Sequence, residues 1–133
     1  MAAPPDDEGK LARIICETWD KVETAVDFFA AESSDLARKT IENVRIFLRF
    51  AVNRYQAPNE IGLGYWPTIR LTWSQSSPPI EVEVFDDHYE FYGFTTDATE
   101  IRHVAVIADT FPNDLRLLLD GAISVPPVVS TGS

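Results

Sequence analysis

The sequence predicts one α+β domain, in which an N-terminal αα-hairpin and a short C-terminal helix pack on a four-stranded antiparallel β-meander. Apolar residues recur at three- and four-residue spacing in the first half of the chain, and they alternate with polar residues from residue 68 onwards. The 133 residues, of which 45% are hydrophobic, suffice for one ordinary core. We expect a flexible leader at residues 1–7, the domain at residues 8–123, and a flexible tail at residues 124–133, which contains Pro126 and Pro127.

Two amphipathic helices are predicted to form the N-terminal hairpin. The first runs from residue 8 to about residue 31, with Asp6 or Asp7 as its cap. Its apolar stripe comprises Leu11, Ile14, Ile15, Trp19, Val22, Val26 and Phe29. A break at residues 33–35 supplies the caps of the second helix, Ser33, Ser34 or Asp35. That helix ends near residue 57, because Pro58 disfavours a helical residue before it.

The two predicted helices carry opposite charge. Residues 6–35 have a balance of −6, and residues 36–57 have a balance of +4. Three arginines of the second helix, Arg38, Arg45 and Arg49, lie along one line beside the apolar stripe. This basic line can pair with the first helix, with the sheet or with a partner. The two internal alternatives are favoured, because such stripes usually pair internally or stay solvated.

The second half of the chain reads as β-structure. Residues 58–67 are predicted to be a connector, in which Gly62 and Gly64 serve loop geometry and do not bind phosphate. Strands are predicted at residues 68–74, at both arms of a hairpin over 80–94, and at 100–107. A last helix begins at Thr110 or Asn113 and ends at Gly121, a plausible C-cap.

The hairpin over residues 80–94 turns at Asp86 and Asp87 and gives the sheet two unlike faces. The predicted core pairs are Val84 with Tyr89, Val82 with Phe91 and Ile80 with Gly93. On the other face Phe85 meets His88, Glu83 meets Glu90 and Glu81 meets Tyr92. That face is therefore both acidic and aromatic. The alternative is that the C-terminal helix covers it and makes its aromatic residues a second small core.

Glu83 directly opposite Glu90 calls for a compensating interaction, because like charges paired across strands are destabilising. Screening by water and salt, neutralisation by Arg70 of the preceding strand, and a cation from outside would each provide it. The cation from outside can be a basic side chain of a partner or a metal ion, and the metal ion is the less favoured of the two. The acidic residues do not have the spacing of a calcium-binding loop, so no metal ligand is assigned.

Charge and composition exclude several classes of protein. A formal charge of −10 and a pI of about 4.5 argue against direct nucleic-acid binding and are compatible with a basic protein partner. Cys16 is the only cysteine, which rules out an internal disulfide and a cysteine metal cluster. The sequence shows neither a secretory signal nor an apolar run long enough to span a membrane. Together these features favour the cytoplasm.

No catalytic or cofactor motif is present in the sequence, and no catalytic or cofactor-binding residue is assigned. Nothing in the sequence places His88 or His103 beside Cys16, which therefore reads as a packing thiol. Paired carboxylates such as Glu83 and Glu90 can act as acid and base, but an exposed strand face would not shift their pKa values. A non-catalytic role is favoured.

Three features of the second half of the chain resemble those of known proteins: Trp73, Ile-Glu-Val-Glu-Val at 80–84, and Asp-His-Tyr-Glu-Phe-Tyr at 87–92. Over roughly residues 66–120 the chain resembles a set of small uncharacterised bacterial proteins with an acidic alternating strand, such a hairpin and a short helix. Small acidic proteins of this kind are often antitoxins, immunity proteins or phage-encoded inhibitors. The resemblance brings no chemistry to particular residues.

We therefore expect a small cytoplasmic interaction protein that neutralises a basic partner, such as a toxin or a nucleic-acid-processing enzyme. The predicted binding residues are Glu81, Glu83, Phe85, Asp86, Asp87, Glu90 and Tyr92. The alternative is a ligand-binding or enzymatic domain with a pocket between the helical hairpin and the sheet, near Trp19, Tyr65, Trp66 and His103. A third hypothesis, a structural subunit, would require a large apolar surface.

Overall fold

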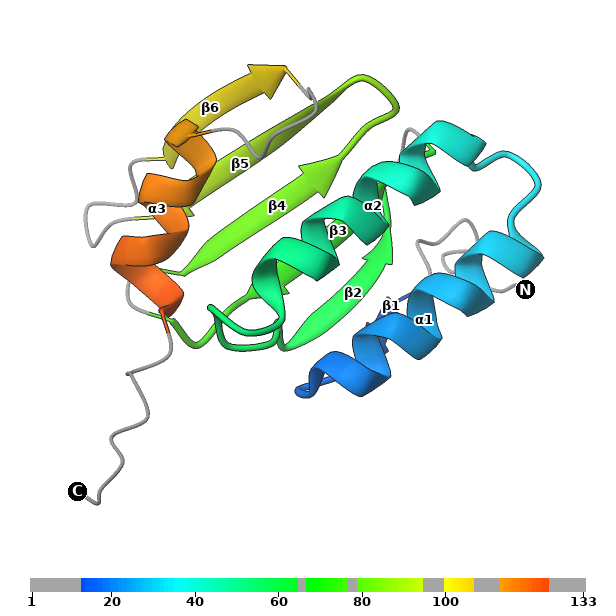
Figure 1. Ribbon diagram of the computed structural model, residues 1–133, viewed down its shortest axis with the longest axis horizontal. Coiled ribbons are helices and arrows are strands. Elements are labelled where there is room, and N and C mark those ends of the chain that lie inside the picture. The colour runs from blue at the N-terminus through cyan, green and yellow to red at the C-terminus, as the bar shows by residue number, and fades with distance from the viewer. Residues whose placement is uncertain (1–12, 65–66, 77–78, 95–99, 107–112, 125–133) are drawn as a thin grey trace, which may run out of the picture.

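The computed structural model describes residues 13–64, 67–76, 79–94, 100–106 and 113–124. In chain order the elements are β1 (Arg13–Ile15), α1 (Trp19–Glu32), α2 (Arg38–Ala51), β2 (Glu60–Leu63), β3 (Ile69–Trp73), β4 (Ile80–Val84), β5 (His88–Phe94), β6 (Glu100–Val106) and α3 (Asn113–Ile123). The strands form one antiparallel sheet in the order β1-β2-β3-β4-β5-β6. All the described helices lie on one side of this sheet (Figure 1). The predicted α+β class is confirmed.

The sheet holds two strands more than the meander predicted over residues 68–107. The first lies in what was predicted to be the start of a helix: residues Arg13–Ile15 form β1 and pair with β2. Two adjacent isoleucines favour a strand, and their helical spacing from Trp19 is coincidental. The helix begins only after Thr18, whose hydroxyl accepts a hydrogen bond from the Lys21 amide at 3.3 Å. The predicted caps Asp6 and Asp7 lie outside the described residues.

The second additional strand, β2, lies in the predicted connector. Ile61 is buried in the core, and β2 pairs with β1 on one side and β3 on the other. Gly64 follows directly and does more than shape a loop. A Cβ atom there would lie 2.2 Å from Thr68 Oγ1 and 2.7 Å from Glu83 Oε2, so the close approach of these groups requires glycine. Tyr65 and Trp66 lie outside the described residues.

The predicted helical hairpin is confirmed, but its two helices begin and end at other residues than predicted. Helices α1 and α2 lie side by side and antiparallel (Figure 1). The cap of α2 is Ala37 and not one of the predicted residues 33–35; Ser33 instead caps the end of α1. Helix α2 stops at Ala51, short of residue 57, and the chain turns so that Tyr55 is buried.

The hairpin formed by β4 and β5 has the predicted register. Val84 lies opposite Tyr89, Val82 opposite Phe91 and Ile80 opposite Gly93. The alternate residues of β3 and β4 are buried, as an antiparallel sheet with one covered face requires. These residues meet the apolar faces of the helices in one core, where the Phe47 ring lies against Trp73 and Tyr89.

Helix α3 belongs to the same core. Leu119 and Ile123 are fully buried, and the Ile123 carbonyl accepts a hydrogen bond from the Gln56 amide at 2.9 Å. The prediction that Gly121 ends the helix is wrong, because the buried Ile123 extends it by half a turn. Of the segments predicted to be flexible, residues 1–7 and 125–133 lie outside the described residues, whereas Ser124 forms an antiparallel β-bridge with Tyr55. No helix in the described part of the chain is long and apolar enough to cross a membrane.

Candidate partner-binding face

The sheet face opposite the helices carries the predicted binding residues. Side chains that alternate with the core residues point to this face: Arg70 from β3, Glu81 and Glu83 from β4, and His88, Glu90 and Tyr92 from β5. The turn between β4 and β5 adds Phe85, Asp86 and Asp87. We call these nine residues the acidic face. All seven predicted binding residues therefore lie on one surface, and their role in binding stays a prediction.

Helix α3 does not cover the acidic face. Its buried residues Leu119 and Ile123 are part of the core between the helices and the sheet, on the opposite side of the sheet from the acidic face. Figure 1 shows α3 over β5 and β6 on the same side as the other helices. The alternative in which the C-terminal helix buries these aromatic residues in a second core is therefore wrong.

Arg70 neutralises Glu81 and not the Glu83–Glu90 pair. Its Nε donates to Glu81 Oε2 at 2.8 Å, and its Nη2 donates to the same oxygen. Although burial disfavours the guanidinium charge, the hydrogen bonds and the charge of Glu81 raise the pKa of Arg70. The Glu81 side chain is only 17% exposed, so this ion pair is held firmly in place.

Glu83 and Glu90 are each held by neutral or cationic donors of their own. Thr68 Oγ1 donates to Glu83 Oε2 at 2.6 Å, from the position that Gly64 leaves open. Tyr92 Oη donates to Glu90 Oε1 at 2.9 Å, and His88 Nε2 lies 3.2 Å from Glu90 Oε2. These donors supply the compensation that a directly opposed carboxylate pair requires.

His88 connects the strand carboxylates with the turn. Its Nδ1 lies 2.6 Å from Asp87 Oδ1, and its ring stacks on Phe85 with centroids 4.2 Å apart. Although burial opposes the charge, hydrogen bonds with Asp87 and Glu90 raise the pKa of His88 above its usual value. The hydrogen bond to His88 in turn lowers the pKa of Asp87. Both ring nitrogens face carboxylate oxygens, which is the geometry of the protonated imidazolium.

The turn is also held from the helical side. Asn43 of α2 is fully buried, and its Nδ2 donates to the carbonyls of Phe85 and Asp86 at 3.1 Å each. This residue was not singled out in the sequence. The available signal was an amide on the apolar side of the predicted second helix, next to Val44 and one turn before Phe47.

Two other sequence candidates, Trp19 and Cys16, have structural roles. Trp19 donates from Nε1 to the Tyr55 carbonyl at 2.9 Å, and core side chains fill the space between the described helices and the sheet. Cys16 is buried and donates to the Pro58 carbonyl at 3.1 Å, and burial raises the pKa of its thiol. The side chain of His103 lies outside the described part of the structure. Within that part, no group of three histidine, cysteine or acidic side chains is placed to hold a metal ion.

Fold and site together define a two-layer α+β protein with an acidic and aromatic sheet face. No protein-family model matches the chain, and no curated protein or solved structure matches it either.

Proposed function

We propose that the protein is an inhibitor of the antitoxin, immunity or phage type, which binds a basic protein through the acidic face and thereby neutralises it. One observation carries the proposal. Five carboxylates share one surface: Glu81, Glu83, Asp86, Asp87 and Glu90. Among the nine residues of the acidic face Arg70 is the one arginine or lysine, and Arg102 of β6 pairs with Tyr92 beside them. The surface is held in place by hydrogen bonds from both sides of the sheet.

This arrangement suits a protein partner. Carboxylates that are already held in one geometry lose little conformational entropy on binding. The exposed Asp86 and Asp87 at the turn would attract a basic surface and accelerate association. Phe85 and Tyr92, half-buried beside these charges, would supply the aromatic centre typical of binding hot spots. We place the complex in the cytoplasm, with a toxin or a nucleic-acid-processing enzyme as the partner.

The test is affinity capture from the native host, with elution across a salt gradient. The tagged wild-type protein is expected to retain a basic protein in stoichiometric amount and to release it as salt rises. Two variants should lose it: Asp86→Lys with Asp87→Lys in the exposed turn, and Glu83→Lys with Glu90→Lys on the strands.

The matched control is Glu17→Lys with Asp35→Lys, which changes the net charge by the same amount at exposed positions away from the acidic face. This control should capture the partner as the wild type does. Equal capture by the wild type and by both acidic-face variants, with folding verified by circular dichroism, would show that this face does not bind.

A further inference from the structure

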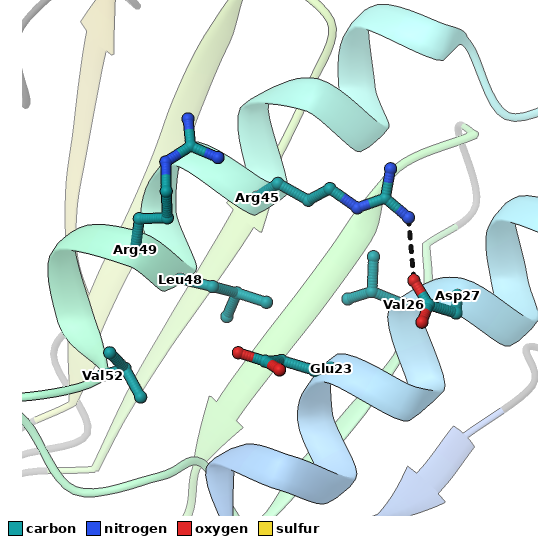
Figure 2. Close-up of a pocket in the computed structure, with 7 residues that line it drawn as sticks. All are labelled: Glu23, Val26, Asp27, Arg45, Leu48, Arg49 and Val52. Atoms are coloured by element: carbon teal, nitrogen blue, oxygen red, sulfur yellow. Dashed lines mark hydrogen bonds and ion pairs between the residues drawn. The ribbon is translucent and has the colours of Figure 1, made fainter.

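A groove of about 470 Å³ runs between α1 and α2 on the side that faces away from the sheet. Figure 2 shows its apolar floor, formed by Val26, Leu48 and Val52. Glu23 and Asp27 of α1 form one wall, and Arg45 and Arg49 of α2 form the other. This surface lies on the opposite side of the molecule from the acidic face, so the two can be tested independently.

The charges that line the groove are segregated by helix: Glu23 and Asp27 come from α1, and Arg45 and Arg49 come from α2. The net charges of the whole helices follow the same division. Helix α1 carries Asp20, Lys21, Glu23, Asp27 and Glu32, a balance of −3. Helix α2 carries Arg38, Lys39, Glu42, Arg45 and Arg49, a balance of +3. All ten residues are exposed. The surface is therefore divided into an acidic half and a basic half.

Two ion pairs within one molecule use four of these ten charges, and one of them joins Lys39 to Glu42 on α2 at 3.8 Å. Asp27 and Arg45 form an ion pair across the groove at 2.8 Å, drawn as a dashed line in Figure 2. Within the described residues, neither Glu23 nor Arg49 forms an ion pair, although both line the groove. A carboxylate and a guanidinium thus stay available at the same end of the groove.

We infer that a second copy of this chain docks on the α1–α2 surface around a two-fold axis that runs along the groove. Rotation about that axis places α1 of one copy over α2 of the other, and the reverse contact forms at the same time. Because the two helices are of opposite charge, both contacts bring acidic over basic side chains. Such a contact is isologous and closes at two subunits.

A second copy suits the surface better than an unrelated ligand does. Any occupant should present positive charge towards α1 and negative charge towards α2, and this chain carries both on its two neighbouring helices. The groove floor is small and the contact is mainly ionic, so the dimer should be weak and salt-sensitive.

The experiment is sedimentation velocity over a range of protein concentrations. We expect a monomer–dimer equilibrium whose Kd rises at least about tenfold between roughly 0.05 M and 0.5 M salt. Two charge-reversed variants should each be monomeric: Glu23→Arg with Asp27→Arg, and Arg45→Glu with Arg49→Glu. Mixed in equal amounts they should form a heterodimer, because each variant again meets opposite charge on both helices.

The control is Glu17→Arg with Asp35→Arg, which alters net charge as the first variant does and should dimerise like the wild type. Thermal unfolding of every variant verifies the fold. Three results would overturn the inference: a wild type that is monomeric at every concentration in low salt, a mixture of reversed variants that stays monomeric, or a dimer that resists salt. A salt-resistant dimer that Phe28→Ser abolishes would place the contact at the apolar groove between β1 and α1 instead, which Ile15 and Phe28 line.

Discussion

Asn43 is the residue on which the shape of the acidic turn depends most directly. Replacing it with alanine removes both hydrogen bonds to the Phe85 and Asp86 carbonyls and leaves a buried space. We expect the free energy of unfolding to fall by about 1–3 kcal/mol, measured by urea denaturation.

Thr40, one turn earlier on α2, is the matched control. It is equally buried, but its hydroxyl has no hydrogen-bond partner in the described part of the structure. Thr40→Val should therefore be neutral or stabilising. Equal losses in the two variants would mean that burial alone, and not the hold on the turn, explains the effect of Asn43→Ala.

His88 makes the stability of the acidic face depend on pH. Its pKa is raised above the unfolded value of about 6.5 by Asp87 and Glu90. The stabilisation that protonated His88 provides is fully present below about pH 6.5 and is lost as pH rises through the folded-state pKa. An NMR titration of the imidazole should give a pKa above 6.5, and Glu90→Gln should lower it. A wild-type pKa at or below 6.5 would contradict this account.

At the scale of elements, two glycines have different reasons for being glycine. Gly64 is needed for close packing, whereas Gly121 only makes the backbone of α3 more flexible. A methyl group at Gly64 would collide with Thr68 Oγ1 and Glu83 Oε2, between the end of β2 and the neighbouring strands. Gly64→Ala is expected to lower the free energy of unfolding by about 1–3 kcal/mol. Gly121→Ala, inside α3 with nothing within 4 Å of the added atom, should raise it by up to about 1 kcal/mol. Chemical denaturation of both variants tests the pair; opposite signs are expected, and a neutral Gly64→Ala would refute the packing argument.

The elements differ in how well their sequence predicts them. The register of β4 and β5 was predictable because a slip by one residue would move every apolar side chain out of the core. Strand β1 was not, because its three residues are too few to show alternation and their spacing from Trp19 mimics a helix. Strand β2 contains Gly62, which weakens a strand pattern, so its segment read as a loop.

At the scale of the whole molecule, long-range hydrogen bonds were beyond what the sequence could predict. The alternation in the sequence predicted that Arg70, Glu81, Glu83 and Glu90 lie on one face. It did not predict that Arg70 pairs with Glu81 and not with the directly opposite Glu83. This preference depends on Thr68, which directly precedes β3 and reaches Glu83 only because Gly64 leaves room. Local periodicity carries no information on such contacts between segments.

The position of α3 has a consequence for synthesis of the chain. From β2 to β6 each strand pairs with the one made just before it, so the sheet can assemble in step with translation. Tyr55, by contrast, finds the Asp120 carboxylate 65 residues later, at 2.6 Å. At roughly 5–20 residues per second, the ribosome needs several seconds to supply this partner. During that interval the core surface that Leu119 and Ile123 cover in the folded protein stays exposed. A chaperone that binds exposed apolar surface would therefore have access to every newly made chain.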